Sequence, residues 1–273
     1  MRYRILLAIV RKDVMVALRN KGVLIPIIIV PLVFFVGLPL LFALLPSALQ
    51  NMPGDPFADF RTMLEQMPGG LREQLSGLNE VQTVIVLALV YFFAPMFLIL
   101  PLMVANVIAA DSFAGEKERK TLEALLHTPA TDLELYLGKL LAAWAPAVAV
   151  SLVGFVLYGL VANIAAWPVM GRVFFPNTMW IVLVLWVAPA AAALGMAAMV
   201  LVSSRAQGFQ DAYQIGGAVV LPVLLLVIGQ MTGVMYFSTG LVALLGLVLW
   251  VLDGVMLWFG VRTFQRGELI ARL

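Results

Sequence analysis

The chain has 273 residues, of which 63% are hydrophobic and 12% charged, with a mean hydropathy of +1.04 and a formal net charge of +2. Soluble domains carry about 25% charged residues, so this composition excludes an ordinary soluble protein and indicates an integral membrane protein. There is no cysteine and only one histidine, His127, which excludes disulfides, thiolate chemistry and a metal centre built from several such ligands.

The first 21 residues predict an amphipathic helix that lies on the membrane surface. On a helical wheel the apolar residues form one stripe and the charged residues occupy the opposite arc. The stripe holds Leu6, Leu7, Val10, Val14, Ala17 and Leu18, and the arc holds Arg4, Arg11, Lys12, Asp13 and Arg19. Two roles stay open for this helix, a simple basic anchor and a mechanical linker.

Six apolar stretches are long enough to cross a bilayer, which takes about 20 residues each. They cover residues 22–45, 81–110, 138–163, 177–203, 213–236 and 238–262. A cleaved signal peptide is the rival interpretation of the first stretch, but the apolar run is too long for one. We therefore predict an all-α, six-span protein with a membrane domain over 22–273, whose first span is bent at its prolines.

The basic residues fall unequally on the two sides that six spans define. Fourteen of the 17 lysines and arginines lie on the side that holds both termini, and three, Arg61, Arg72 and Arg172, lie on the other. The positive-inside rule then predicts that both termini are cytoplasmic.

The connections on the outer side are short. Residues 46–80 predict a small cap of two short helices, and Trp167 and Trp180 are placed as interface anchors around the next loop. Only a few residues join the fifth and sixth spans, so either these spans are antiparallel neighbours or a part near 228–240 is re-entrant. The alanine-rich fourth span, with Gly195, favours close helix packing.

The stretch GEKERKTLEALLHTP, residues 115–129, is the dense run of charge between spans 2 and 3. Pairs four residues apart, Glu116 with Lys120 and Arg119 with Glu123, favour a helix in water. Pro129 ends that helix, and Thr131 with Glu134 has the spacing of a capping box for the next one. The pattern predicts a cytoplasmic elbow over 111–137, and a plain solvated loop is the alternative.

This stretch, followed by LYLGKLLA, resembles the cytoplasmic signature of type-2 ABC transporter permeases of the sodium-, drug- and polysaccharide-exporter-like class. The amphipathic start, the turn SSRAQGFQDAYQ and the ending VRTFQRGELIARL are similar as well, so the resemblance covers all six spans. The outer regions are shorter than in many such exporters, which leaves the substrate unassigned.

The resemblance implies a permease that pairs with a second permease, identical or homologous, and with two cytoplasmic ATPase subunits that bind ATP and magnesium. It implies a bacterial or archaeal plasma membrane and a coupling helix seated in each ATPase. The positions that match the coupling helix are Glu116, Glu118, Arg119, Thr121, Leu122, Glu123, Leu126 and Pro129. Arg11, Lys12 and Asp13 are similar to part of the connecting helix beside it.

The chain lacks the motifs of an enzyme. No G-x-x-x-x-G-K-[ST] sequence occurs, so no phosphate-binding loop of that kind can hold ATP. No serine has a recognisable base, and the basic residues are spread along one membrane face rather than gathered for nucleic acid. We expect a transport subunit with no cofactor, metal or nucleic acid of its own.

Three polar residues inside the spans are candidates for a translocation path: Asp253, Gln230 and Asn106. An ionised carboxylate in lipid costs several kcal/mol, so Asp253 is protonated, hydrogen-bonded or next to water. A structural hydrogen bond is the alternative for each of the three.

The function predicted from the sequence is the permease of an ATP-driven transporter, with export as the expected direction. Two alternatives remain: a carrier driven by an ion gradient through Asp253, and a membrane subunit that only anchors a partner. The substrate is not predicted.

Overall fold

The structure is a computed structural model that describes residues 2–49, 61, 64, 67, 69–119, 130–203, 206, 208–232 and 235–263, with side chains to residue 260. In these ranges the regular elements are all helices. Six of them are long and apolar enough to cross a membrane: Lys21–Leu49, Glu80–Glu118, Asp132–Met170, Thr178–Ser203, Phe209–Met231 and Thr239–Gly260. The predicted all-α, six-span fold is confirmed, and we call these helices spans 1 to 6.

Several spans change helix type along their length. Span 1 comprises α2 (Lys21–Leu32), the π-helix η1 (Val33–Gly37) and α3 (Leu38–Leu49). Span 2 comprises α6 (Glu80–Val86), the π-helix η2 (Leu87–Phe92), α7 (Phe93–Phe97), α8 (Ile99–Ala110), the π-helix η3 (Asp111–Gly115) and α9 (Glu116–Glu118). Span 3 is α11 (Asp132–Met170), and span 4 comprises α12 (Thr178–Val182), the π-helix η4 (Leu183–Val187) and α13 (Ala188–Ser203). Span 5 comprises α14 (Phe209–Gly216), the 3-10 helix η5 (Gly217–Val220) and α15 (Leu221–Met231), and span 6 is α16 (Thr239–Thr263). Before them comes α1 (Tyr3–Arg19), and α5 (Gly69–Leu75) lies between spans 1 and 2.

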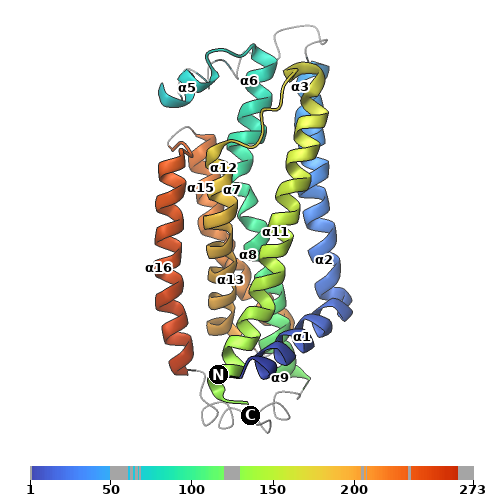
Figure 1. Ribbon diagram of the computed structural model, residues 1–273, viewed down its shortest axis with the longest axis vertical. Coiled ribbons are helices and arrows are strands. Elements are labelled where there is room, and N and C mark those ends of the chain that lie inside the picture. The colour runs from blue at the N-terminus through green and yellow to red at the C-terminus, as the bar shows by residue number, and fades with distance from the viewer. Residues whose placement is uncertain are drawn as a thin grey trace.

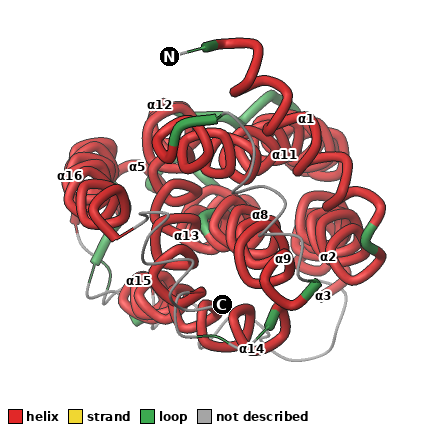
Figure 2. Tube along the Cα trace, turned by 90° about the horizontal axis from the view of Figure 1, so that it is seen from below, coloured by secondary structure: helices red, strands yellow, loops and turns green. Residues whose placement is uncertain are grey.

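Spans 2 and 4 form the centre of the bundle. In the most apolar part of each, 72% and 61% of the residues are buried, against 17% in spans 5 and 6. Seen along the bundle, α8 and α13 lie in the middle, with α11, α2, α14, α15 and α16 around them (Figure 2). The outward faces of the surrounding spans are apolar, as a lipid environment requires.

The two central spans approach closely because Gly195 has no side chain. A Cβ atom added there would lie 2.7 Å from the backbone oxygen of Leu102 in α8. Backbone cannot move aside as a flexible side chain can, so only glycine permits this distance. The predicted use of small residues for close packing in span 4 is thus confirmed at Gly195.

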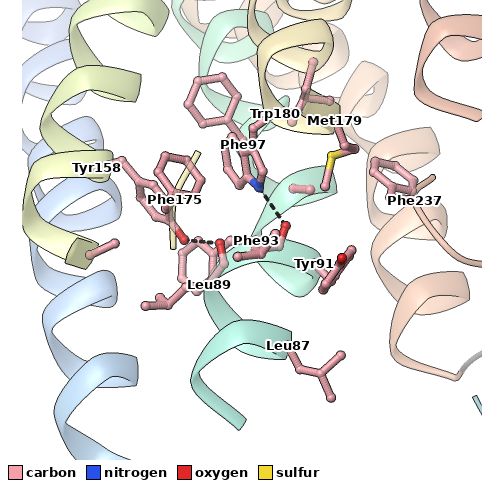
Figure 3. Close-up of a cluster of buried hydrophobic side chains, with 14 of the residues drawn as sticks. Leu87, Leu89, Tyr91, Phe93, Phe97, Tyr158, Phe175, Met179, Trp180 and Phe237 are labelled. Carbon is pink, nitrogen blue, oxygen red and sulfur yellow. Dashed lines mark hydrogen bonds between the residues drawn. The ribbon is translucent and has the colours of Figure 1, made fainter. Parts of the chain in front are cut away.

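An aromatic cluster of Phe97, Tyr158, Phe175 and Trp180 fills the core between spans 2, 3 and 4 (Figure 3). The Trp180 indole donates a hydrogen bond of 2.7 Å to the Val90 carbonyl, and the Tyr158 hydroxyl donates one of 2.6 Å to the Leu89 carbonyl. Both acceptors lie in the π-helix η2, just before Pro95, which has no N–H for the helical ladder. The placement of Trp180 as an interface anchor was wrong: it is fully buried by this cluster, whereas Trp167 is exposed.

The connections agree in part with the sequence. The capping box at the start of α11 is confirmed, with Thr131 and Glu134 each accepting from the other's backbone N–H. Within the described part of the outer segment 46–80, α5 is the short helix with assigned bounds. At the turn from α15 to α16, Gln230 accepts a 3.1 Å hydrogen bond from the Phe237 N–H.

Candidate functional site

Four parts of the chain meet at the end of the bundle drawn at the bottom of Figure 1: α1, the last turns of span 2, the first turns of α11, and α14. We call this the basal end. Segment 115–129 leaves span 2 at this end, and the structure describes it as far as Arg119. Thr121, Leu122, Glu123, Leu126 and Pro129 lie outside the described residues.

A cluster of charges, buried except at Lys12, joins three of these parts. It consists of Lys12 and Asp13 of α1, Ser112 and Glu116 of span 2, and Lys139 of α11, and we call it the basal cluster. The Lys139 ammonium is 0% exposed and donates to a Glu116 carboxylate oxygen at 2.5 Å and to the Ser112 carbonyl at 2.6 Å. Its Nζ also lies 3.6 Å from an Asp13 carboxylate oxygen.

The other members complete the cluster. The Ser112 hydroxyl donates a 2.6 Å hydrogen bond to Asp13, and Lys12 pairs with both Asp13, at 3.0 Å, and Glu116. Two cations thus face two carboxylates, which is the condition under which buried charges are tolerated. Burial lowers the pKa of the Lys12 amine, but the hydrogen bond that its ammonium donates to Glu116 and the charge of Asp13 outweigh burial and leave the pKa raised.

A second ion pair lies beside the basal cluster. Arg119 donates to Asp111 at 2.9 Å, and the Asn20 amide donates to the same carboxylate oxygen at 3.0 Å. The hydrogen bond with Asp111 raises the pKa of Arg119. Gly115 leaves room for this pair, since an added Cβ atom would lie 3.0 Å from the Asp111 oxygen.

α1 is also fixed to α11 at two further points. The backbone N–H of Arg2 donates to Glu134 at 2.8 Å, and the Arg2 side chain pairs with the same carboxylate at 3.3 Å. Ile9 packs so tightly against Gly138 that an added Cβ atom would lie 2.8 Å from its side chain. α1 is therefore held to spans 2 and 3 along its length.

Two sequence interpretations are corrected here. Asp13 was placed on one charged arc with Arg4, Arg11 and Arg19, which are exposed, but Asp13 itself is 4% exposed because it contacts Ser112 and Lys139. Glu116 was expected in water with Lys120 as partner, but it is 3% exposed and bound by Lys12 and Lys139. Helix α1 exists as predicted, and its position on a membrane surface stays a prediction.

Glu118 contacts another span. One of its carboxylate oxygens accepts a 2.9 Å hydrogen bond from the Phe209 N–H at the start of α14. The neighbouring Lys117 ammonium donates a 3.4 Å hydrogen bond to the carbonyl of Ala206, which lies in the connection just before span 5.

The three residues suggested for a translocation path are not brought together. Gln230 holds the turn at the far end of α15, Asn106 packs against Gly216 near the basal end, and Asp253 lies on the buried stripe of α16. Asp253 is 1% exposed, and within the described residues neither carboxylate oxygen has a hydrogen-bond partner. Gln230 does form a structural hydrogen bond, but with the Phe237 N–H in the adjoining turn rather than with another span.

Sequence reasoning missed Ser112, Asp111 and Lys139 as members of the site. Asp111 and Ser112 interrupt an otherwise apolar run, which was a usable signal. Lys139 was counted only among the basic residues of the cytoplasmic face. In the described residues no group of three or more histidine, cysteine, aspartate or glutamate side chains is arranged for a metal ion.

Comparison with known proteins gives one result. The family model described as ABC-2 family transporter protein matches residues 7–262, which is nearly the whole chain. No curated protein and no solved structure matches it.

Proposed function

The chain belongs to the ABC-2 family of transporter proteins and is a membrane permease of a type-2 ABC transporter, and on that premise we propose that it exports its substrate with energy from separate ATPase subunits. Two ATPases bind ATP and magnesium, and each contacts one permease through segment 115–129. A second copy of this chain, or a homologous permease, completes the transporter.

The observation that carries this proposal is the basal cluster. Segment 115–129 begins at Gly115, and the residue that follows, Glu116, is bonded to α1 through Lys12 and to α11 through Lys139. A force applied to this segment therefore reaches α1 and span 3 as well as span 2. A solvated loop has no need of a four-charge attachment at its root in which Asp13, Glu116 and Lys139 are buried, because burying those charges carries a large desolvation cost.

The orientation follows from the charge distribution. The basal end carries the excess of lysine and arginine, so we place it, both termini and the ATPases in the cytoplasm. The family resemblance supports the plasma membrane of a bacterium or archaeon as the location. Since the chain has no phosphate-binding loop, nucleotide hydrolysis belongs to the partner.

The test is purification of the tagged chain from its own cells in a mild detergent, followed by identification of the bound proteins and reconstitution. We expect a protein with a phosphate-binding loop to copurify and ATP hydrolysis to depend on both. The double variant Leu122→Glu, Leu126→Glu should lose this partner while its elution profile on gel filtration stays that of the wild type. Retention of the ATPase by the variant contradicts the docking role of segment 115–129.

A carrier driven by an ion gradient is a second candidate, favoured by one observation: the Asp253 carboxyl, deep in span 6, is buried without a hydrogen-bond partner in the described residues. This candidate predicts that flux in proteoliposomes continues without ATP and follows a proton or sodium gradient. Flux that stops when ATP is removed excludes it.

A further inference from the structure

We infer that Glu118 is a positioning residue that ties span 5 to the root of segment 115–129, so that displacement of this segment moves span 5 together with span 3. The inference rests on the proposed function for its role in transport. The attachment itself is a feature of this chain alone and can be tested without any partner.

The first observation concerns the start of span 5. A helix leaves its first N–H groups without intrahelical partners, and the side chain of the N-cap residue, just before the helix, usually accepts a hydrogen bond from one of them. Here that position is Gly208, which has no side chain to do so. The Glu118 carboxylate from span 2 takes this role at 2.9 Å, and its negative charge is favoured at a helix N-terminus.

Gly208 is the residue that makes this approach possible. A Cβ atom added to it would lie 2.7 Å from the same Glu118 oxygen that binds Phe209, a distance that real Cβ atoms do not adopt. A larger residue at 208 therefore displaces the Glu118 carboxylate from this position. Gly208 leaves the space that the carboxylate occupies, and the charge of Glu118 suits the N-terminus of α14.

The second observation concerns the other end of α14. At Gly216 an added Cβ atom would lie 2.3 Å from the Met199 methyl group of α13 and 3.0 Å from the Asn106 amide oxygen of α8. α14 is thus held at both ends: Glu118 accepts a hydrogen bond at its first turn, and Met199 and Asn106 of the central spans pack against its last turn. This gives Asn106 a packing role against span 5, which differs from the translocation path suggested by the sequence.

The third observation is how little else holds span 5. Only 17% of its most apolar window is buried, against 72% in span 2, so α15 has few contacts that could resist a pull on α14. Span 5 is held at α14 and has few contacts along α15, so α15 should move with α14. Movement of the Glu118 region is therefore transmitted to span 5 at α14.

This changes the meaning of Glu118. The family resemblance places it with the residues that face the ATPase, whereas its carboxylate here is engaged by α14 of its own chain. Glu116 links segment 115–129 to span 3 through Lys139, and Glu118 links it to span 5. A displacement of segment 115–129 is then transmitted to span 3 through Glu116 and to span 5 through Glu118.

The experiment measures the attachment directly. Because the chain has no cysteine, spin labels at Arg11→Cys and Gln210→Cys report the distance between α14 and α1, which the basal cluster fixes to span 2. We expect a narrow distribution in the parent and a broad one in Glu118→Ala and in Gly208→Ala. Since a hydrogen bond to a charged group is lost, the ratio of held to released molecules should fall about tenfold. Gly217→Ala is the matched control, because a Cβ atom there meets nothing within 4 Å.

The functional arm uses the complex with its ATPase, without labels. We expect Glu118→Ala to keep the ATPase bound and hydrolysing while substrate moved per ATP falls, and Glu118→Gln, which keeps an acceptor oxygen, to recover part of it. An unchanged distance distribution in Glu118→Ala overturns the inference, whether or not the variant keeps its ATPase. If no ATPase binds the wild type, the proposed function fails, but the distance measurement still decides the attachment.

Discussion

Lys139 shows how far the basal end depends on a single side chain. Its ammonium is the donor shared by Glu116, Ser112 and, at longer range, Asp13, and it has no exposure to solvent. Removal of one member of a buried ion cluster leaves the others charged in a medium of low dielectric constant, which costs more than the cluster contributes when intact.

We therefore predict that Lys139→Met destabilises the protein by about 3–5 kcal/mol. Thermal unfolding in detergent measures this, with Lys21→Met as the matched control because Lys21 is exposed at the start of α2. Combining Lys139→Met with Glu116→Gln should recover part of the loss, since one uncompensated charge is then removed. Equal stability of Lys139→Met and Lys21→Met contradicts the assignment.

Asp253 presents the opposite case, a buried carboxyl with no hydrogen-bond partner among the described residues. A buried polar group without a partner costs about 1–3 kcal/mol. Asp253→Leu should therefore unfold at a higher temperature than the wild type. Asp253→Asn, which keeps a buried polar group, should unfold close to the wild-type temperature. If flux falls while stability rises, the carboxyl has a role in transport; a fall in stability shows instead that it has a structural partner.

The residue scale is also where sequence reasoning failed. Asp13 and Ser112 are 99 positions apart, and Lys12 and Glu116 are 104 apart. A helical wheel and the four-residue spacing rule describe only neighbours within one helix, so the wheel placed Asp13 with exposed charges and the spacing rule paired Glu116 with Lys120. The composition of one sequence carries no sign that these charges meet, because the partners come from different helices.

At the scale of elements, apolar length located all six spans, since a bilayer demands uninterrupted helices. The predicted end of span 2 at residue 110 fell short, because the helix continues to Glu118. It continues because Asp111, Ser112 and Glu116 find partners inside the protein, so polarity there does not mark a helix end. The π-helical turns were not predicted either, since they have no sequence period.

The contact between spans 2 and 4 gives a prediction at this scale. Gly195→Ala forces a methyl group against the Leu102 backbone, whereas Gly254→Ala in α16 meets nothing within 4 Å. We expect Gly195→Ala to cost about 1–3 kcal/mol, the usual range for overpacking, and Gly254→Ala to be neutral or slightly stabilising. Unfolding of both variants in the same detergent measures the difference, and equal values exclude a tight α8–α13 contact.

For the whole molecule, the burial of the spans describes two unequal parts. Spans 2 and 4, joined by the aromatic cluster, form a rigid centre, while spans 5 and 6 have little contact beyond one stripe each. The polar attachments of α1 to spans 2 and 3, and of α14 to span 2, lie at the basal end. A motor that acts on this end therefore works where span 5, one of the two loosely packed spans, is fixed.

This arrangement requires the basal end to face the cytoplasm, where ATP is available. Arg11 is exposed on α1 at the basal end, and Arg172 is exposed in the connection between α11 and α12 at the other. Since the natural chain has no cysteine, Arg11→Cys and Arg172→Cys each offer one thiol to a membrane-impermeant maleimide. In intact cells we expect labelling of Arg172→Cys alone, and labelling of Arg11→Cys only after the membrane is permeabilised. The reverse pattern places segment 115–129 outside the cell, where no ATPase could drive it.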